Sequence, residues 1–104
     1  MAFYLYHCQD MDERELALAI RQQHLQAHLD YVEAHIDRYA VAGPNRETGG
    51  EYRASTFVVR ADDLADADAL MAADPYVAAG LYRAVRGVEF VPVAGEWVGG
   101  IGWK

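Results

Sequence analysis

The chain has 104 residues, of which 53% are hydrophobic, and its formal net charge at pH 7 is −7. This length predicts a single domain over residues 1–104, small enough to favour association with another subunit. The high hydrophobic content excludes an intrinsically disordered chain. The negative charge argues against nucleic acid as a partner, because nucleic-acid binding depends on a basic surface.

Cysteine usage and hydropathy indicate the cellular compartment. Cys8 is the single cysteine, so no intrachain disulfide and no cysteine-based metal cluster can form. The apolar run Met1–Cys8 has neither a basic flank nor a cleavage site, so it does not indicate a secretory signal. No apolar stretch approaches the ~20 residues that span a bilayer. We therefore expect a soluble, cytoplasmic protein with no membrane partner.

The first half of the chain predicts a strand, a long helix and a second strand. Phe3–Cys8 is rich in aromatic residues and largely apolar on both faces, which is typical of a strand covered on both sides. Residues 10–38 predict one long helix with Asp10 or Asp12 as its N-cap. Tyr39–Ala42 predicts a short strand that ends at Gly43–Pro44.

On a helical wheel the long helix has an apolar stripe with histidines beside it. The stripe consists of Leu18, Leu25, Leu29, Val32 and Ile36. The histidines beside it are His24, His28 and His35.

The second half predicts a strand, a helix and a last strand. Ala54–Arg60 is strongly β-prone. A second helix starts at Asp62 or Asp63 and ends near Ala73, because Pro75 prevents its continuation. One short turn is expected over residues 76–80, and a long strand over residues 85–93. The glycine-rich tail, residues 93–104, predicts a weak strand or an arm.

The order β-α-β-β-α-β is the split βαβ pattern of ferredoxin-like α+β folds. Such a fold has one four-stranded antiparallel sheet with two helices on one face. The other face is bare, yet the predicted strands are apolar on both sides. Because exposed apolar faces of this size are unusual in a monomer, we expect a second copy to cover it, which gives a homodimer with a dimeric α+β barrel.

Four segments also match the motifs of a known family in order and spacing. They are FYLYHCQD, a first strand that ends in an acid; IRQQHL; DRYAVAGP; and ADPYVAAGLY, the most specific of the four. Together they lie within residues 3–91, and the chain resembles the YciI-like (YCII-related) family. The resemblance implies a ferredoxin-like dimeric α+β barrel. It also implies an active site formed by a helix histidine and the aspartate of Asp-Pro-Tyr; one branch of the family eliminates chloride from a chlorinated hydroxyquinol.

The family aspartate corresponds to Asp74, but the family histidine corresponds to either His24 or His28. His24 fits the upstream motif IRQQHL, whereas His28 fits the spacing to Ala-Gly-Pro. If the two helices are antiparallel, the end of the second lies beside the early part of the first. This geometry favours His24 as the partner of Asp74.

A histidine–aspartate pair predicts acid/base chemistry. A carboxylate bonded to one ring nitrogen fixes the tautomer and makes the other nitrogen a better base toward a phenol or carbon acid. Such chemistry suits elimination or isomerisation of a small molecule and needs no cofactor. In the opposing interpretation Asp74 only ends a helix, the histidine only packs, and the chain is a non-catalytic ligand- or partner-binding homodimer.

Three further residues are candidates for substrate binding, each with a structural alternative. Arg21 could hold a substrate anion or pair with an acid on its own helix. Tyr76, which follows the Asp74–Pro75 corner, could line the pocket. His7 could join the pocket, although an ordinary strand position at a sheet edge is favoured. His24 and His28 have the spacing of a metal-binding pair, but such pairs arise easily by chance and His35 lies too far along the helix, so we expect no metal.

Overall fold

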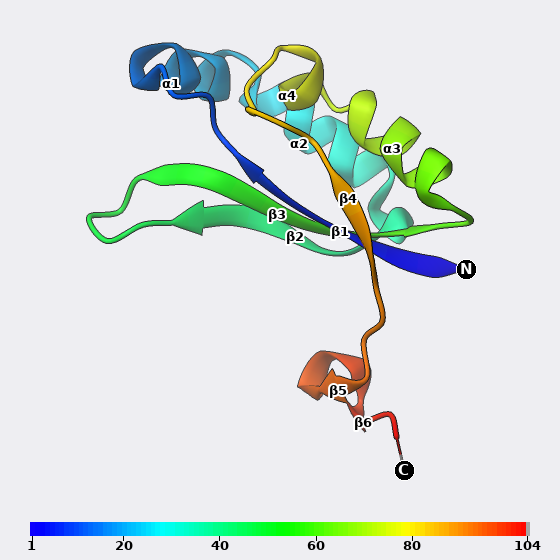
Figure 1. Ribbon diagram of the computed structural model, residues 1–104. Helices are drawn as coiled ribbons and strands as arrows, with labels where there is room; N and C mark the ends of the chain where they lie inside the picture. The colour runs from blue at the N-terminus through cyan, green and yellow to red at the C-terminus, as the bar shows by residue number, and fades with distance from the viewer. Residues whose placement is uncertain (104) are drawn as a thin grey trace.

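The computed structural model describes residues 1–103 and has the βαββαβ order, with additions (Figure 1). The strands of its main sheet are β1 (Ala2–Gln9), β2 (Tyr39–Arg46), β3 (Tyr52–Ala61) and β4 (Gly87–Phe90). The helices are α1 (Arg14–Gln23), α2 (Leu25–Ala34), α3 (Leu64–Ala72) and α4 (Pro75–Ala78), with a short 3-10 turn, η1 (Ile36–Arg38). A small hairpin, β5 (Ala94–Gly95) and β6 (Gly100–Ile101), encloses the turn η2 (Glu96–Val98).

The sheet has strand order β2-β3-β1-β4, and all of its neighbouring strands are antiparallel. The helices lie on one side of it (Figure 1). This arrangement confirms the predicted α+β, ferredoxin-like class. Within the described residues, no helix is long and apolar enough to cross a membrane.

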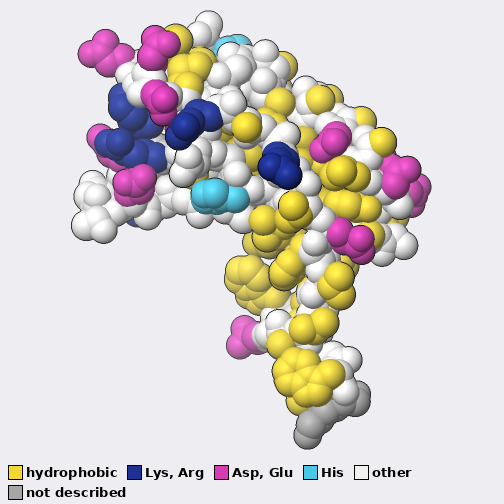
Figure 2. Space-filling model, in the orientation of Figure 1, with side chains coloured by type: hydrophobic (Ala, Val, Ile, Leu, Met, Phe, Trp, Pro, Cys, Tyr) yellow, Lys and Arg dark blue, Asp and Glu magenta, His cyan; other side chains and the backbone are white. Residues whose placement is uncertain are grey.

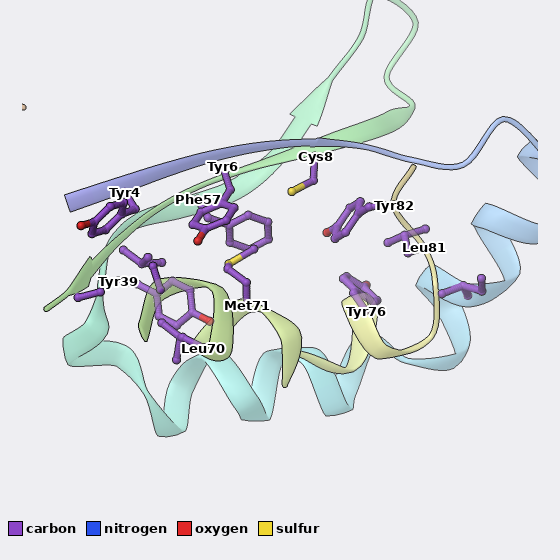
Figure 3. Close-up of a cluster of buried hydrophobic side chains, with 14 of the residues drawn as sticks. Tyr4, Tyr6, Cys8, Tyr39, Phe57, Leu70, Met71, Tyr76, Leu81 and Tyr82 are labelled. Carbon is purple, nitrogen blue, oxygen red and sulfur yellow. The ribbon is translucent and has the colours of Figure 1, made fainter. Parts of the chain in front are cut away.

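The core fills the space between the sheet and the helices (Figure 3). Alternate residues of β1 point into it, and register pairs Tyr6 with Phe57 of β3 across the same face. The core is built largely from aromatic side chains. Tyr6 is fully buried, and its hydroxyl reaches Asp68 of α3 at 2.7 Å.

The opposite face of the sheet is apolar and has no layer over it; we call it the open face. The alternation along the strands places six apolar side chains there: Phe3, Leu5, Val41, Val58, Val88 and Phe90. Val88 and Phe90 are 54% and 42% exposed, while Val58, in the middle of the face, is shielded by its neighbours. The sequence had predicted such a bare apolar face.

The prediction of one helix over residues 10–38 was wrong. The segment divides at His24, whose φ of −106° and ψ of 7° interrupt the helical backbone between α1 and α2. Neither predicted N-cap is used: Glu13 stands at the cap position, because the carboxylate of Asp10 is held by Arg21. The apolar stripe of this segment stays partly exposed; Leu18, Leu25 and Leu29 line a cavity instead of filling the core.

Two strand boundaries also differ from the prediction. β2 does not end at Gly43–Pro44 but continues to Arg46, because Pro44 lies on an edge strand, where a missing N–H is tolerated. The last strand is only Gly87–Phe90, with Pro92 following soon after it. The chain beyond Phe90 leaves the body and forms the β5–β6 hairpin (Figure 1).

The helix α3 agrees with its prediction. Its N-cap is Asp63, whose side chain accepts a hydrogen bond from the backbone N–H of Asp66 at 2.8 Å. The helix ends at Ala72, and after the corner at Asp74 the proline begins the single turn α4. This corner positions the candidate site.

Candidate active site

Asp74 is held rigidly at the corner between α3 and α4. Its φ of −65° and ψ of 129° are extended, as a following proline requires, and it is the N-cap of α4. One carboxylate oxygen accepts a hydrogen bond from the backbone N–H of Tyr76 at 2.9 Å. The side chain is fully buried. A buried carboxylate needs more than one such partner, and the second comes from α2.

That second partner is His28. Its Nδ1 lies 2.8 Å and 2.9 Å from the two carboxylate oxygens of Asp74. Because an ionised carboxylate only accepts hydrogen bonds, Nδ1 carries the proton and donates it. The neutral ring is thereby fixed as the tautomer whose Nε2 has a free lone pair.

Aromatic contacts hold the imidazole of His28 in place. The ring stacks on Tyr76 with 4.1 Å between centroids and 14° between planes. The same ring is nearly perpendicular to Phe57, with 6.4 Å between centroids and 81° between planes. The Tyr76 hydroxyl in turn donates to the backbone carbonyl of Arg21 at 3.1 Å, so α4 is tied to α1. The His28 side chain keeps 14% of its surface exposed.

The exposed edge of His28 faces a cavity of about 570 Å³ between the helices and the β2–β3 hairpin. Its walls are mainly apolar, and its polar lining residues include His28, Arg21, Ser55, Gln22 and Glu51. Volume and composition are typical of small-molecule sites, which combine apolar walls with a few convergent polar groups. The lining includes Leu18, Leu25, Leu29, Pro44, Phe57 and Tyr76.

A largely buried ion pair joins Arg21, which lines the same cavity as His28, to Asp10. Arg21 of α1 makes two hydrogen bonds of 2.7 Å to the carboxylate of Asp10, a bidentate pair. The Asp10 partner raises the pKa of the guanidinium although burial opposes this. Arg21 also lies 3.4 Å from the Ser55 hydroxyl, and its charge stands 5.8 Å from the Tyr76 ring centroid. The site therefore contains a fixed positive charge whose direction is set by Asp10.

The surrounding phenols are kept in their neutral form. Burial raises the pKa of Tyr76, and the negative charge of Asp74 acts in the same direction while Arg21 opposes it. Burial likewise raises the pKa of Tyr82, which lies behind the site, next to Tyr76 in Figure 3. At neutral pH both phenols are therefore un-ionised: Tyr76 donates its hydrogen bond to the Arg21 carbonyl, whereas the buried Tyr82 hydroxyl has no hydrogen-bond partner within the described residues.

The expected pairing of His24 with Asp74 is wrong. The antiparallel argument assumed one straight helix, but the break at His24 places this residue between α1 and α2, and Asp74 meets His28 one turn further on. His24 is half-buried and does not line the cavity. The other candidate for the family histidine, His28, was identified by its spacing to Ala-Gly-Pro. It is the histidine that lies next to Asp74 in the structure.

The structure also separates His7 from the site. His7 lies on the open face of the sheet, where its Nδ1 is 3.3 Å from the Thr56 hydroxyl. The suggestion that it joins the pocket is therefore wrong. His7 is a strand residue, as favoured, but β1 is an inner strand of the sheet and not an edge strand. Arg21 and Tyr76 do line the cavity. Arg21 pairs with an acid, but that acid is at the end of β1 and not on its own helix.

Sequence reasoning missed Asp10 and Ser55. We interpreted Asp10 as a helix cap. An acid at the end of the first strand is one of the family features, and this feature could have identified Asp10 as a site residue. Ser55 has no local signal, because only the β1–β3 pairing brings it beside Arg21. In the part of the chain that the structure describes, no group of three or more His, Cys, Asp or Glu residues could hold a metal ion.

The chain is similar to known proteins over most of its length. The family model of the YCII-related domain matches residues 2–91 of the sequence. A protein of Haemophilus influenzae, described only as uncharacterized, is 36% identical over 90 residues, which cover 80% of this chain and 90% of that protein.

Among solved structures, one match is the 5-chloro-2-hydroxyhydroquinone dehydrochlorinase TftG of Burkholderia phenoliruptrix, in complex with 2,5-dihydroxybenzoquinone. Its TM-score is 0.75 at 24% identity, with 92% of this chain and 97% of that chain covered. This likeness establishes the shared ferredoxin-like fold.

Proposed function

The chain belongs to the YCII-related family, and we propose that it is a small-molecule enzyme of lyase or isomerase type that uses His28 as its acid/base group. The observation that carries the proposal is the pair of His28 with the buried Asp74 at the wall of an apolar cavity. Asp74 holds Nδ1–H, so Nε2 is the ring atom available for proton transfer. No cofactor is part of the proposal, because proton transfer by a positioned imidazole suffices for these reactions.

The proposed substrate is a hydroxylated aromatic compound. The cavity offers aromatic and aliphatic walls for a flat ring, and Phe57 and Tyr76 lie beside the histidine. The fold is that of TftG, a dehydrochlorinase of 5-chloro-2-hydroxyhydroquinone. We therefore take this compound as the first candidate.

The proposed reaction is an elimination that balances without an external oxidant or reductant. His28 accepts the proton of a ring hydroxyl through Nε2, and the resulting phenolate takes up a proton at the carbon that bears chlorine. Loss of a second hydroxyl proton then expels chloride, so the products are a hydroxybenzoquinone and HCl. One positioned base of this kind contributes typically 10²–10⁴ in rate.

Arg21 is proposed to stabilise the phenolate. Its guanidinium uses Nε and one terminal nitrogen for Asp10, and the residue lines the same cavity as His28. A fixed positive charge near a developing negative oxygen lowers the energy of the anion without reorganisation. The Asp10 pair would hold this charge in position, so Asp10 acts through Arg21.

We also propose that the working unit is a homodimer. The open face of the sheet leaves Phe90, Val88 and Val41 partly exposed, and a second copy packed on this face would remove them from water. The small size of the chain supports this, because short chains bury a limited share of their own surface.

Chloride release from 5-chloro-2-hydroxyhydroquinone under anaerobic conditions tests the proposal. We expect turnover by the wild type and a 10²–10⁴-fold lower rate for His28→Asn. His24→Asn is the matched control, since it removes a histidine of the same helical segment that does not line the cavity, and we expect it to retain most of the activity.

Equilibrium binding of 2,5-dihydroxybenzoquinone separates the alternatives. If the wild type binds this compound but converts none of a panel of halogenated hydroxyquinols, the chain is a binding module with a retained fold. Equal turnover by wild type and His28→Asn would reject His28 as the acid/base group.

A further inference from the structure

The chain beyond β4 forms a projecting segment, residues 91–103, that we call the C-terminal arm. It starts directly after Phe90 and contains the β5–β6 hairpin. Figure 1 shows it leaving the body of the molecule, and Figure 2 shows hydrophobic side chains continuing from the body along it. Except for residue 91, the arm lies beyond the part of the chain that the family model matches.

The arm has an ordered backbone but no core of its own. Two residue pairs join β5 to β6, and the N–H of Gly102 donates to the carbonyl of Val93 at 2.6 Å. Its side chains nevertheless stay in water: Trp97 is 84% exposed and Trp103 66%. The other exposed apolar residues of the arm are Val91, Val93, Val98 and Ile101.

Such a segment needs a surface to pack against. A single two-stranded hairpin is marginally stable at best in water, and contiguous exposed apolar side chains mark contact sites. Tryptophan is the residue type most often found at the energetic centre of interfaces. The arm carries two of them within seven residues, with a single charged residue, Glu96.

Charge and position together identify the partner. The net charge of −7 disfavours an anionic membrane as the partner, and the nearly uncharged arm itself adds little charge repulsion where it meets a second copy. The arm also prolongs β4, the edge strand that places Val88 and Phe90 on the open face. A second copy that covers this face therefore comes within reach of the arm.

We propose that the C-terminal arm of each copy docks through Trp97 and Trp103 on the second copy and clasps the pair together. The arm adds the two tryptophans to an interface whose centre is the open face. This inference rests on the proposed homodimer, and the experiment below distinguishes failure of the clasp from failure of the pairing.

The two arm tryptophans are the only tryptophans of the chain, so tryptophan fluorescence of the full-length protein reports on the arm alone. We expect emission at shorter wavelength than N-acetyltryptophanamide at concentrations where sedimentation shows a dimer. On dilution the emission maximum should shift to the wavelength of a solvated indole. This shift should occur over the same concentration range in which the dimer dissociates. Phe90→Asp, designed to disrupt the open face, should give monomers with solvated tryptophans at all concentrations.

A matched pair of arm variants tests the contact itself. Trp97→Ser should raise the dimer dissociation constant roughly 10-fold or more, as loss of an interface anchor does. Glu96→Gln changes the neighbouring side chain without removing apolar surface and should leave the constant unchanged.

Four results would overturn the clasp. Dimers with fully solvated tryptophans would reject it while leaving the pairing of the open faces intact. A blue-shifted emission that persists in monomers would place the arm on its own subunit. A shift seen only with phosphatidylcholine–phosphatidylserine vesicles would make it a membrane contact. Absence of any dimer in the wild type would reject both the clasp and the homodimer.

Discussion

At the scale of single residues, one carboxylate serves two purposes. Asp74 caps α4 through the Tyr76 N–H and fixes the tautomer of His28 through Nδ1. The two interpretations of this aspartate that the sequence left open, a helix terminator and a catalytic partner, are therefore compatible in structure. The cap accounts for its position, and the same carboxylate meets the histidine through both of its oxygens.

The substitution Asp74→Asn separates the two purposes. Asparagine is as good an N-cap as aspartate, so we expect the free energy of unfolding to change by about 1 kcal/mol or less from the cap itself. Its amide can present N–H to Nδ1 and so favour the tautomer with the proton on Nε2, which cannot act as the base. Chloride release should fall by roughly 10²–10⁴, as for His28→Asn.

Asp68→Asn is the control for this comparison. It makes the same chemical change on α3, away from the cavity, where the Tyr6 hydroxyl is the only hydrogen-bond donor to the carboxylate within residues 1–103. An Asp74→Asn enzyme with wild-type turnover would mean that the carboxylate has no part beyond the cap.

The residues of the site differ in how far the sequence could predict them. The corner at Asp74 was predictable because Pro75 restricts both its own backbone and that of the residue before it. The identity of the histidine was not, since it depends on the direction of α2 after the break at His24. No proline or glycine marks that break, so helix periodicity continued across it.

At the scale of elements, β4 is positioned by a close approach to β1. Gly87 pairs with Tyr6, and a Cβ added to this glycine would stand 2.5 Å from the Tyr6 ring carbon that bears the hydroxyl. The Tyr6 ring is buried and tied to Asp68 at 2.7 Å, so it has little room to move. The glycine thus allows the last strand to join the sheet.

Gly87→Ala should therefore destabilise the protein. We expect its free energy of unfolding in urea to fall by roughly 1–3 kcal/mol, the usual cost of overpacking. Gly43→Ala is the matched control on β2, where a new Cβ meets nothing within 4 Å, and it should be close to neutral. Equal stability of the two variants would show that Tyr6 moves aside freely.

The elements show why some boundaries were predictable and others were not. The β-branched run of β3 and the Asp63 cap of α3 are local signals, and both elements formed as predicted. The length of β4 is not locally encoded: residues 91 and 93 are as β-prone as residue 88, but the sheet ends where β1 begins at Ala2. Asp10, at the start of the predicted long helix, was misassigned as an N-cap because its partner, Arg21, is brought to it only by the tertiary structure.

At the scale of the whole molecule, the protein is one sheet with one covered and one open face. Burial on the covered face raises the pKa of Tyr6, Tyr39 and Tyr82 well above the ordinary value of 10.0, and for Tyr6 the hydrogen bond to Asp68 adds to this. Folding therefore holds three phenols in the neutral form.

This predicts cooperative unfolding in alkali. Because these pKa values are raised in the folded state, the stability linked to the phenols is complete below pH 10.0 and is lost as the pH rises toward the folded values. Tyrosinate absorbance of the buried group should appear together with loss of circular dichroism, above pH 10. Ionisation of all seven tyrosines near pH 10 with the fold intact would contradict the buried core.

The central claim is that His28 presents an unprotonated Nε2 to a ligand while Asp74 holds Nδ1–H, and nitrogen-15 NMR of the histidine side chains tests it directly. At a pH where the ring is neutral, we predict a protonated Nδ1 and an unprotonated Nε2 for His28. Addition of 2,5-dihydroxybenzoquinone should shift the His28 Nε2 resonance and leave that of His7 unchanged. A protonated Nε2, or a ligand that shifts His7 and not His28, would contradict the account.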